Sequence, residues 1–375
     1  MAGEFVSFLD QPTEARGPLT RAELTGLVRQ ATRSLGFDAV GIARADLPLT
    51  AEMDRYAAFL AGGLYGEMKF LEQNRAARAR LDGPEILLGA KSVICVARRY
   101  RRTPEEEGRD PELARAIARY ARGRDYHRFL RRRLRRLATL LRKLGTPSCP
   151  VRARPLCDEE PVLERAWAAR AGLGFVGKNG LLIVPGVGSM VLLGEVVTTL
   201  ELEPDVPLAE RCGSCTRCLE ACPTGAFMKP FVLDPRRCIA YLTIEKRTEM
   251  PIDLAPAVGE HLFGCDDCQT VCPFNAGRGV RAAAAENHDP FAPLERWSRL
   301  ALEDLLILDE ARWREIAQGT PLRRAGRIGL ARNAAIVLGN RGDVASLPAL
   351  RSAASAHDAI VVREAAAWAS SQLDP

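Results

Sequence analysis

The sequence predicts a multidomain α+β protein, in which an α/β N-terminal domain precedes a small cysteine-rich domain and a helical C-terminal domain. Three observations support this. In the first 200 residues, short apolar runs typical of strands alternate with helical periodicity. Eight of the 11 cysteines fall in the stretch that begins at Cys212 and ends at Pro273. A helical pattern recurs near the C-terminus. We place the domains at residues 1–203, 204–285 and 286–375.

The composition is that of an ordinary soluble protein, with 47% hydrophobic and 27% charged residues. No apolar run approaches the length of a membrane span, so no membrane partner is expected. The formal charge of +6 allows an anionic partner without demanding one. The first residues lack the basic region, apolar run and cleavage site of a signal peptide, so we expect a cytoplasmic protein.

The N-terminal domain is predicted to be rich in βαβ units. Helical periodicity runs over residues 19–36, and residues 37–43 are typical of a strand. A second strand is predicted at residues 91–97, an apolar run rich in β-branched residues. Cys95 lies inside this run and is expected to be a core residue. Further along, the pattern predicts a helix over 161–172, a glycine-rich turn over 174–180 and strands at 181–184 and 189–199.

The strongest basic signal lies in residues 111–145. An apolar stripe at helical spacing is formed by Phe129, Leu130, Leu134, Leu137 and Leu141. Arginines occupy the other faces of this predicted helix. They are either a solvated helix face or a surface that follows a phosphate backbone, and the sequence leaves both possibilities open.

Three consecutive carboxylates, Asp158, Glu159 and Glu160, lie at a predicted junction between a strand and a helix. A helix N-terminus favours negative charge at such a junction. A carboxyl group screened from water there could donate a proton to a developing oxyanion. The alternative is that Asp158 only caps the helix.

The cysteine-rich stretch follows the spacing of bacterial ferredoxins, in which three close thiolates hold one cluster and the fourth reaches another. Its first run is Cys-x2-Cys-x2-Cys-x3-Cys-Pro and its last is Cys-x2-Cys-x3-Cys-Pro, with a lone cysteine between them. Eight cysteines supply the four thiolate ligands that each of two 4Fe–4S clusters needs. The first would be held by Cys212, Cys215, Cys218 and Cys272, and the second by Cys222, Cys238, Cys265 and Cys268.

Zinc and disulfides are the other uses of clustered cysteines. A structural zinc site takes four ligands, so eight cysteines at these offsets fit it poorly. Disulfides require an oxidising compartment, for which the chain carries no export signal. We therefore expect an electron carrier or a reductase.

A repeat is visible in the C-terminal domain. The pattern of residues 332–340 recurs at 363–371, and residues 344–350 supply a helix between them. Paired helices at such a period are typical of HEAT-like repeats. Several arginines near the start of this region would suit a phosphate backbone: Arg323, Arg324, Arg327, Arg332 and Arg341.

Taken together, these motifs resemble the epoxyqueuosine reductase family. The similarity runs from about residue 20 to the end, including the HEAT-like region. It is carried by residues 119–127, Asp158 followed by 163–166, 171–179, the order of the eight cysteines, 223–226 and 264–273.

The resemblance implies a cobalamin-dependent oxidoreductase that acts on tRNA with a GUN anticodon. Members of this family remove the epoxide oxygen of epoxyqueuosine at the wobble position, giving queuosine and water. Cobalamin would lie between the N-terminal and cluster domains and receive single electrons from the two clusters. An external one-electron donor such as ferredoxin or flavodoxin would supply them. We expect a monomer.

The resemblance also implies roles for individual residues. Asp158 matches the proton donor of the family and is therefore a cofactor-site residue as well. Arg80, Arg237 and the backbone of Gly264 and Cys265 match positions that line the cobalamin. Lys246 matches a basic position near the tRNA.

The chain departs from the family pattern directly after Asp158, where Glu159 and Glu160 replace a Thr or Ser and a small residue. These carboxylates could raise the pKa of Asp158 through like-charge repulsion, or could face solvent. No histidine is an evident lower ligand to cobalt, and only His127 invites a role.

Two alternatives remain. One is another cobalamin and iron–sulfur reductase, such as a reductive dehalogenase, although these usually carry an export signal. The other is a ferredoxin-like electron-transfer protein, which would leave Asp158 without a role.

Overall fold

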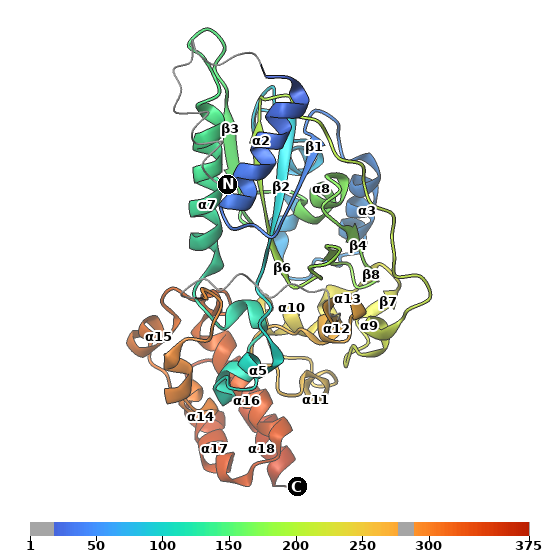
Figure 1. Ribbon diagram of the computed structural model, residues 1–375. Helices are drawn as coiled ribbons and strands as arrows, with labels where there is room; N and C mark the ends of the chain where they lie inside the picture. Colours follow the sequence, from blue (N-terminus) through green and yellow to red (C-terminus); the bar gives the residue numbers. More distant parts are fainter. Residues whose placement is uncertain (1–18, 277–288, 375) are drawn as a thin grey trace.

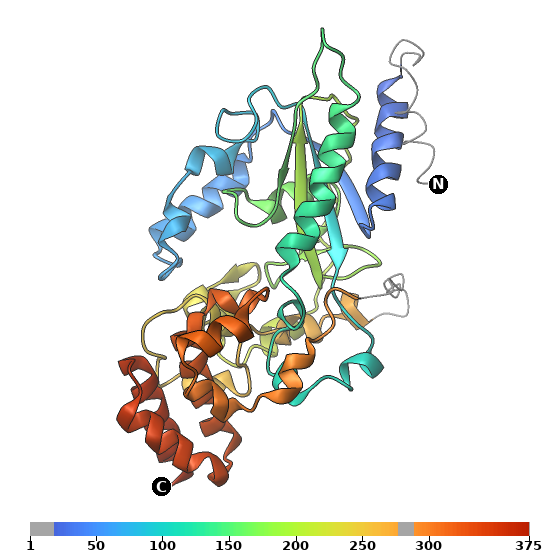
Figure 2. The ribbon, with the colours of Figure 1, turned by 90° about the vertical axis from the view of Figure 1, so that its left-hand side faces the viewer.

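The computed structural model describes residues 19–276 and 289–374, and it shows a sheet-based region stacked on a helical region (Figures 1 and 2). The predicted domain boundary at 285, and the first residues on which the absence of an export signal was judged, lie outside the described residues. No helix in the described part of the chain has both the length and the apolar character needed to cross a membrane.

A four-stranded antiparallel sheet forms the centre of the upper region. Its order is β1 (Ala39–Arg44), β2 (Ser92–Arg99), β6 (Val191–Thr198) and β3 (Ala153–Leu156). All three pairings are antiparallel. The expectation of βαβ units is therefore wrong for these strands, because apolar runs reveal a strand but not its direction. Every residue of β2 is buried, which confirms that Cys95 belongs to the core.

Helices cover both faces of this sheet (Figure 2). One face carries α2 (Arg21–Ser34) and α7 (Tyr126–Arg142), and the other carries α3 (Thr50–Ala61), α4 (Arg75–Ala79) and α8 (Glu164–Arg170). Side chains of β2 alternate between the faces, so that Ile94 joins the α7 side and Cys95 the α8 side.

Helix α7 has the predicted apolar stripe, in which Leu130, Leu134, Leu137 and Leu141 are all 0% exposed. Phe129 is only partly buried, beneath the guanidinium of Arg133. Helix α8 starts at Glu164, three residues later than the start predicted from Pro161.

The cysteine-rich segment contains short elements only. It includes one hairpin, formed by β7 (Phe227–Lys229) with β8 (Val232–Leu233), while a hairpin of β4 (Phe175–Val176) with β5 (Leu182–Ile183) precedes the segment. The short helices of this part are α9 (Arg217–Glu220), α10 (Ile239–Ile244), α11 (Ala255–Val258), α12 (Asp267–Thr270) and α13 (Pro273–Ala276).

The C-terminal helices pack on this segment. They are α14 (Leu302–Leu306), α15 (Glu310–Ala317), α16 (Gly326–Arg341), α17 (Leu347–Ala356) and α18 (Ile360–Leu373). Helices α16 and α18, which contain the two recurring patterns, lie against each other, and a Cβ added at Gly339 would stand 2.8 Å from the Cα of Ala369. Leu242 and Leu254 share one buried core with Ala335 and Leu338 of α16.

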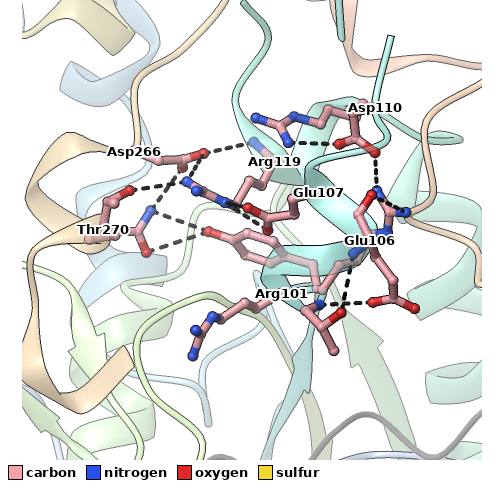
Figure 3. Close-up of polar contacts among 12 residues, drawn as sticks. Arg101, Glu106, Glu107, Asp110, Arg119, Asp266 and Thr270 are labelled. Carbon is pink, nitrogen blue, oxygen red and sulfur yellow. Dashed lines mark hydrogen bonds and ion pairs between the residues drawn. The ribbon is translucent and has the colours of Figure 1, made fainter. Parts of the chain in front are cut away.

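A polar network joins the sheet region to the cysteine-rich segment (Figure 3). It is built around the segment after β2, which carries α5 (Pro104–Glu107) and α6 (Glu112–Arg115). The backbone N–H of Arg119 donates to Asp266 at 2.7 Å, and its guanidinium donates to Glu107 at 2.9 Å and to Thr270 at 3.1 Å. Asp266 directly follows one of the predicted cluster ligands, so this network fixes that ligand's neighbourhood relative to the segment that follows β2.

Candidate active site

Asp158 lies on the turn between β3 and α8, in the left-handed region with φ 60°. Its carboxylate Oδ2 accepts a hydrogen bond of 2.5 Å from the Tyr126 hydroxyl and lies 3.1 Å from Nε2 of His127. Glu164 Oε1 accepts the backbone N–H of Asp158 at 2.8 Å and so stabilises the strained turn. The hypothesis that Asp158 caps α8 is wrong, because its side chain is turned toward the start of α7.

His127 lies between two carboxylates. Its Nδ1 lies 2.7 Å from Asp125 Oδ1, so each ring nitrogen faces a carboxylate oxygen. Ionised carboxylates only accept, and therefore both nitrogens carry hydrogen. Burial opposes the charged ring, but the hydrogen bonds with Asp125 and Asp158 outweigh it and raise the pKa of His127 to about 9. The hydrogen bond from His127 is in turn the main reason that the pKa of Asp158 is lowered.

The two extra carboxylates do not act on Asp158 as like charges. Glu159 forms an ion pair with Arg131 of α7. Glu160 accepts the backbone N–H of Cys157 at 2.9 Å. The pKa of Asp158 is lowered rather than raised, so the repulsion hypothesis is wrong.

A chain of aromatic rings connects Asp158 to the cysteine-rich segment. Tyr126 meets Tyr120 edge-on with ring centroids 5.9 Å apart, and Tyr120 contacts Phe263 at 6.4 Å. The backbone N–H of Ala118 donates to Phe263 O at 2.8 Å, which fixes the two segments together. Phe263 stands two residues before Cys265. Sequence reasoning missed Tyr120 and Tyr126, although both belong to the 119–127 motif.

Thiols of the same predicted ligand set lie near one another, and Cys268 also lies near Cys218 of the other set, so the assignment of ligands to the two clusters stays a prediction. Burial raises the pKa of Cys272, and the nearby Cys215 thiol adds to the shift. Cys218 is influenced by the same two thiols in the same direction. In the other set, burial raises the pKa of Cys265, with further contributions from Cys268 and Cys238. All 11 cysteines are free thiols, so the disulfide alternative is wrong.

The spacing of the thiols fits clusters better than zinc. Within the described residues, no three cysteine sulfurs lie within 4.8 Å of one another. A tetrahedral zinc with bonds of about 2.3 Å holds its sulfurs about 3.8 Å apart. A cluster that places its own iron and sulfide atoms between the thiolates suits the wider separation.

Comparison with known proteins identifies the family of this chain. Residues 211–275 match the family described as "4Fe-4S double cluster binding domain", and residues 80–158 match "Epoxyqueuosine reductase QueG, DUF1730". An epoxyqueuosine reductase from Gloeobacter violaceus is 43% identical over 320 residues, which cover 84% of this chain and 96% of the relative. The chain belongs to the epoxyqueuosine reductase family.

Other relatives extend the match to nearly the whole chain. An epoxyqueuosine reductase from Escherichia coli is 35% identical over 95% of this chain and 91% of its own length. A crystal structure of an epoxyqueuosine reductase with an epoxyqueuosine-modified tRNA stem loop superposes with a TM-score of 0.82 at 31% identity, covering 95% of this chain and 92% of that one. The mixed helix and sheet architecture with an iron–sulfur domain is thus that of the epoxyqueuosine reductases.

The residues predicted to contact cobalamin and tRNA have intramolecular partners. Arg80 pairs with Asp82 at 2.7 Å. Arg237 donates twice to Thr224 O, at 3.1 and 2.9 Å, and the N–H of Gly264 donates to Thr243 Oγ1 at 2.9 Å. The ammonium of Lys246 is largely buried, 2.6 Å from Thr248 Oγ1 and 3.4 Å from Glu67 Oε1. Their roles toward the cofactor and the RNA stay predictions.

The C-terminal arginines do not form one phosphate-binding surface. Arg332 is 0% exposed, and its guanidinium donates to the carbonyls of Leu242, Lys246 and Thr248, so its assignment to RNA is wrong. The others differ in their partners: Arg327 pairs with Asp358, Arg341 with Glu112 and Glu260, Arg324 with Glu245, and Arg323 is exposed.

Proposed function

We propose that this protein is a tRNA epoxyqueuosine reductase, which reduces the epoxide of epoxyqueuosine at the wobble position to queuosine. Opening the epoxide and releasing its oxygen as water consumes two electrons and two protons. A proton donor and an electron source must therefore meet at one place. The observation that carries the proposal is that Asp158, backed by the charged His127, is joined through Tyr126, Tyr120 and Phe263 to the cluster segment at Cys265.

The site fits a redox cofactor placed between the sheet region and the cluster segment. The Asp158 carboxylate is 52% exposed and so can face a bound group, while its neighbours Tyr126 and Tyr120 lead to Cys265. We propose that this group is cobalamin, held by Arg80, Arg237 and the backbone of Gly264 and Cys265. When bound, cobalamin supplies the reducing equivalents at an epoxide carbon.

The chain's own residues supply the proton. As the carbon–oxygen bond opens, the proton on Nε2 of His127 passes across 3.1 Å to the ionised Asp158 carboxylate, which hands it on to the leaving oxygen. Asp125 holds the opposite side of the ring at 2.7 Å and keeps the imidazole aimed at Asp158. The half-exposed carboxylate can take the second proton from solvent.

This arrangement predicts a falling alkaline limb in the pH profile. His127 has a pKa raised to about 9, so it keeps its proton at neutral pH and loses it as the pH rises through that value. Turnover should therefore decline above about pH 9. Anaerobic single-turnover rates measured from pH 6 to 10 would show the limb, and His127→Gln should abolish it. An unchanged limb in that variant would remove His127 from proton delivery; tRNA affinity measured over the same range is the control.

The proposed function is tested by nucleoside analysis of tRNA. Cells that lack this protein should accumulate epoxyqueuosine and lose queuosine, and the wild-type gene should restore it. Purified protein with both clusters and cobalamin should convert epoxyqueuosine in tRNA under anaerobic conditions. Normal queuosine in the deletion strain would instead favour a ferredoxin-like electron-transfer role.

The proposal extends to the domain organisation, the cellular location and the electron donor. We place a catalytic domain at residues 1–203, a ferredoxin-like domain at 204–285 and HEAT-like helices at 286–375, the last supported by the packing of α16 against α18. The protein would act as a cytoplasmic monomer on tRNA with a GUN anticodon, reduced by a ferredoxin or flavodoxin.

The turn that carries Arg323 and Arg324 is a proposed tRNA contact near the site. The charge of Arg324 helps to lower the pKa of Asp158, which places this turn close to the carboxylate. Arg323→Glu should weaken tRNA binding and reduce the dependence of affinity on salt by about one phosphate contact. Filter binding at several salt concentrations measures this, with Arg351→Glu on α17 as the control. Equal affinity and salt slope for Arg323→Glu and the control would exclude this turn from the RNA surface.

A further inference from the structure

His261 lies against one of the proposed cluster ligands. Its Nε2 is 3.5 Å from Sγ of Cys265 and 3.0 Å from Oδ2 of Asp267. The backbone N–H of Asp267 also points at the same sulfur, at 3.5 Å. In the described part of the chain, these three residues are the one set whose possible ligand atoms all lie within 4.8 Å of one another.

The hydrogen on the ring can be assigned from its partners. An ionised carboxylate and a ligated thiolate both only accept hydrogen bonds. Nε2 of His261 faces one of each, so it must be the donor. Its N–H is shared between Asp267 Oδ2 and Cys265 Sγ, and Asp267 contributes its backbone N–H as a second donor to the sulfur.

A separate metal ion at these three residues conflicts with the cluster. Cys265 lies near Cys268 and Cys238, which belong to the second ligand set. Removing Cys265 for another ion would leave that cluster with three cysteines. His261 and Asp267 therefore act on the sulfur from outside the ligand set.

We propose that His261 is a positioning residue that donates a hydrogen bond to Cys265 Sγ and thereby raises the reduction potential of the second cluster. An added electron increases the negative charge on the cluster sulfurs, and donors to those sulfurs stabilise it. The second cluster adjoins the aromatic chain to Asp158, so a higher potential there favours electron arrival beside the active site. The inference rests on the clusters of the proposed function but not on its substrate.

Thr224 is a second hydrogen-bond donor to the same cluster, and its substitution can be tested independently of His261. Its Oγ1 lies 3.6 Å from Sγ of Cys222, another ligand of the second set. Because a ligated thiolate only accepts, the hydroxyl donates. Thr224→Val should lower the reduction potential of the same cluster as His261→Phe. A shift of the same resonance signal in both variants identifies that signal as the second cluster.

The test is a redox titration of the full-length protein carrying both clusters, anaerobic, without cobalamin or tRNA, followed by electron paramagnetic resonance. His261→Phe should lower the midpoint potential of one cluster and leave the other unchanged as an internal reference. His261→Gln keeps an N–H donor and should return the potential toward wild type. Asp267→Asn removes a negative charge and should not lower it.

Several results would overturn the inference. These are unchanged potentials in His261→Phe, equal shifts of both clusters, failure of Gln to restore the value, or loss of iron from the Phe variant, since a donor to an intact cluster is not needed for its assembly. None of them bears on whether epoxyqueuosine is the substrate, which the nucleoside analysis decides separately.

Discussion

Asp158→Asn should lower the rate of epoxyqueuosine reduction in tRNA by roughly 100- to 10,000-fold, the usual contribution of a general acid. The amide keeps the size of the carboxyl group and can still accept from Tyr126, whose hydroxyl lies 2.5 Å from Oδ2. It cannot pass on the proton of His127. Single-turnover assays with nucleoside analysis measure the effect.

The matching controls separate chemistry from assembly. Asp158→Asn should retain the iron content of both clusters, the spectrum of bound cobalamin and the affinity for tRNA. Tyr126→Phe removes one hydrogen bond to the carboxylate without removing the proton path from His127, so its rate should fall much less. Wild-type turnover in Asp158→Asn would remove this residue from the mechanism.

Arg332→Met should reduce the free energy of unfolding by about 3 to 5 kcal/mol, although it lies far from any proposed reacting atom. Its guanidinium donates to Leu242 O at 2.6 Å, Thr248 O at 2.6 Å and Lys246 O at 3.0 Å. Methionine fills similar space but leaves these carbonyls without donors. The guanidinium thus links α16 to α10 and to the segment that follows it.

Chemical unfolding of the protein measures this loss, and Arg323→Met is the matched control. Arg323 is exposed, so its substitution should change stability by less than about 0.5 kcal/mol. If Arg332→Met and Arg323→Met unfold at the same denaturant concentration, the buried guanidinium does not stabilise the packing of α16.

Local patterns were enough for much of this chain. The stripe of α7 predicted its buried face, because apolar residues at helical spacing face the core whatever the core contains. The β-branched run around Cys95 predicted a buried strand in the same way. The cysteine spacing predicted two ligand sets, since three thiolates so close in sequence can reach only one centre.

Only the tertiary structure showed which segments distant in the sequence pack together, and this packing determines strand order, hydrogen-bond partners and burial. The antiparallel order of the sheet could not be read from apolar runs, because period and composition do not encode strand direction. Asp158 meets His127 only because the turn after β3 packs beside the start of α7, 31 residues earlier in the sequence. The sequence pattern grouped Arg332 with the surface arginines, but the structure buries it among three carbonyls, where it stabilises the packing of α16. A side chain's charge is written in the sequence, but its partner and its exposure are set by which segments pack against it.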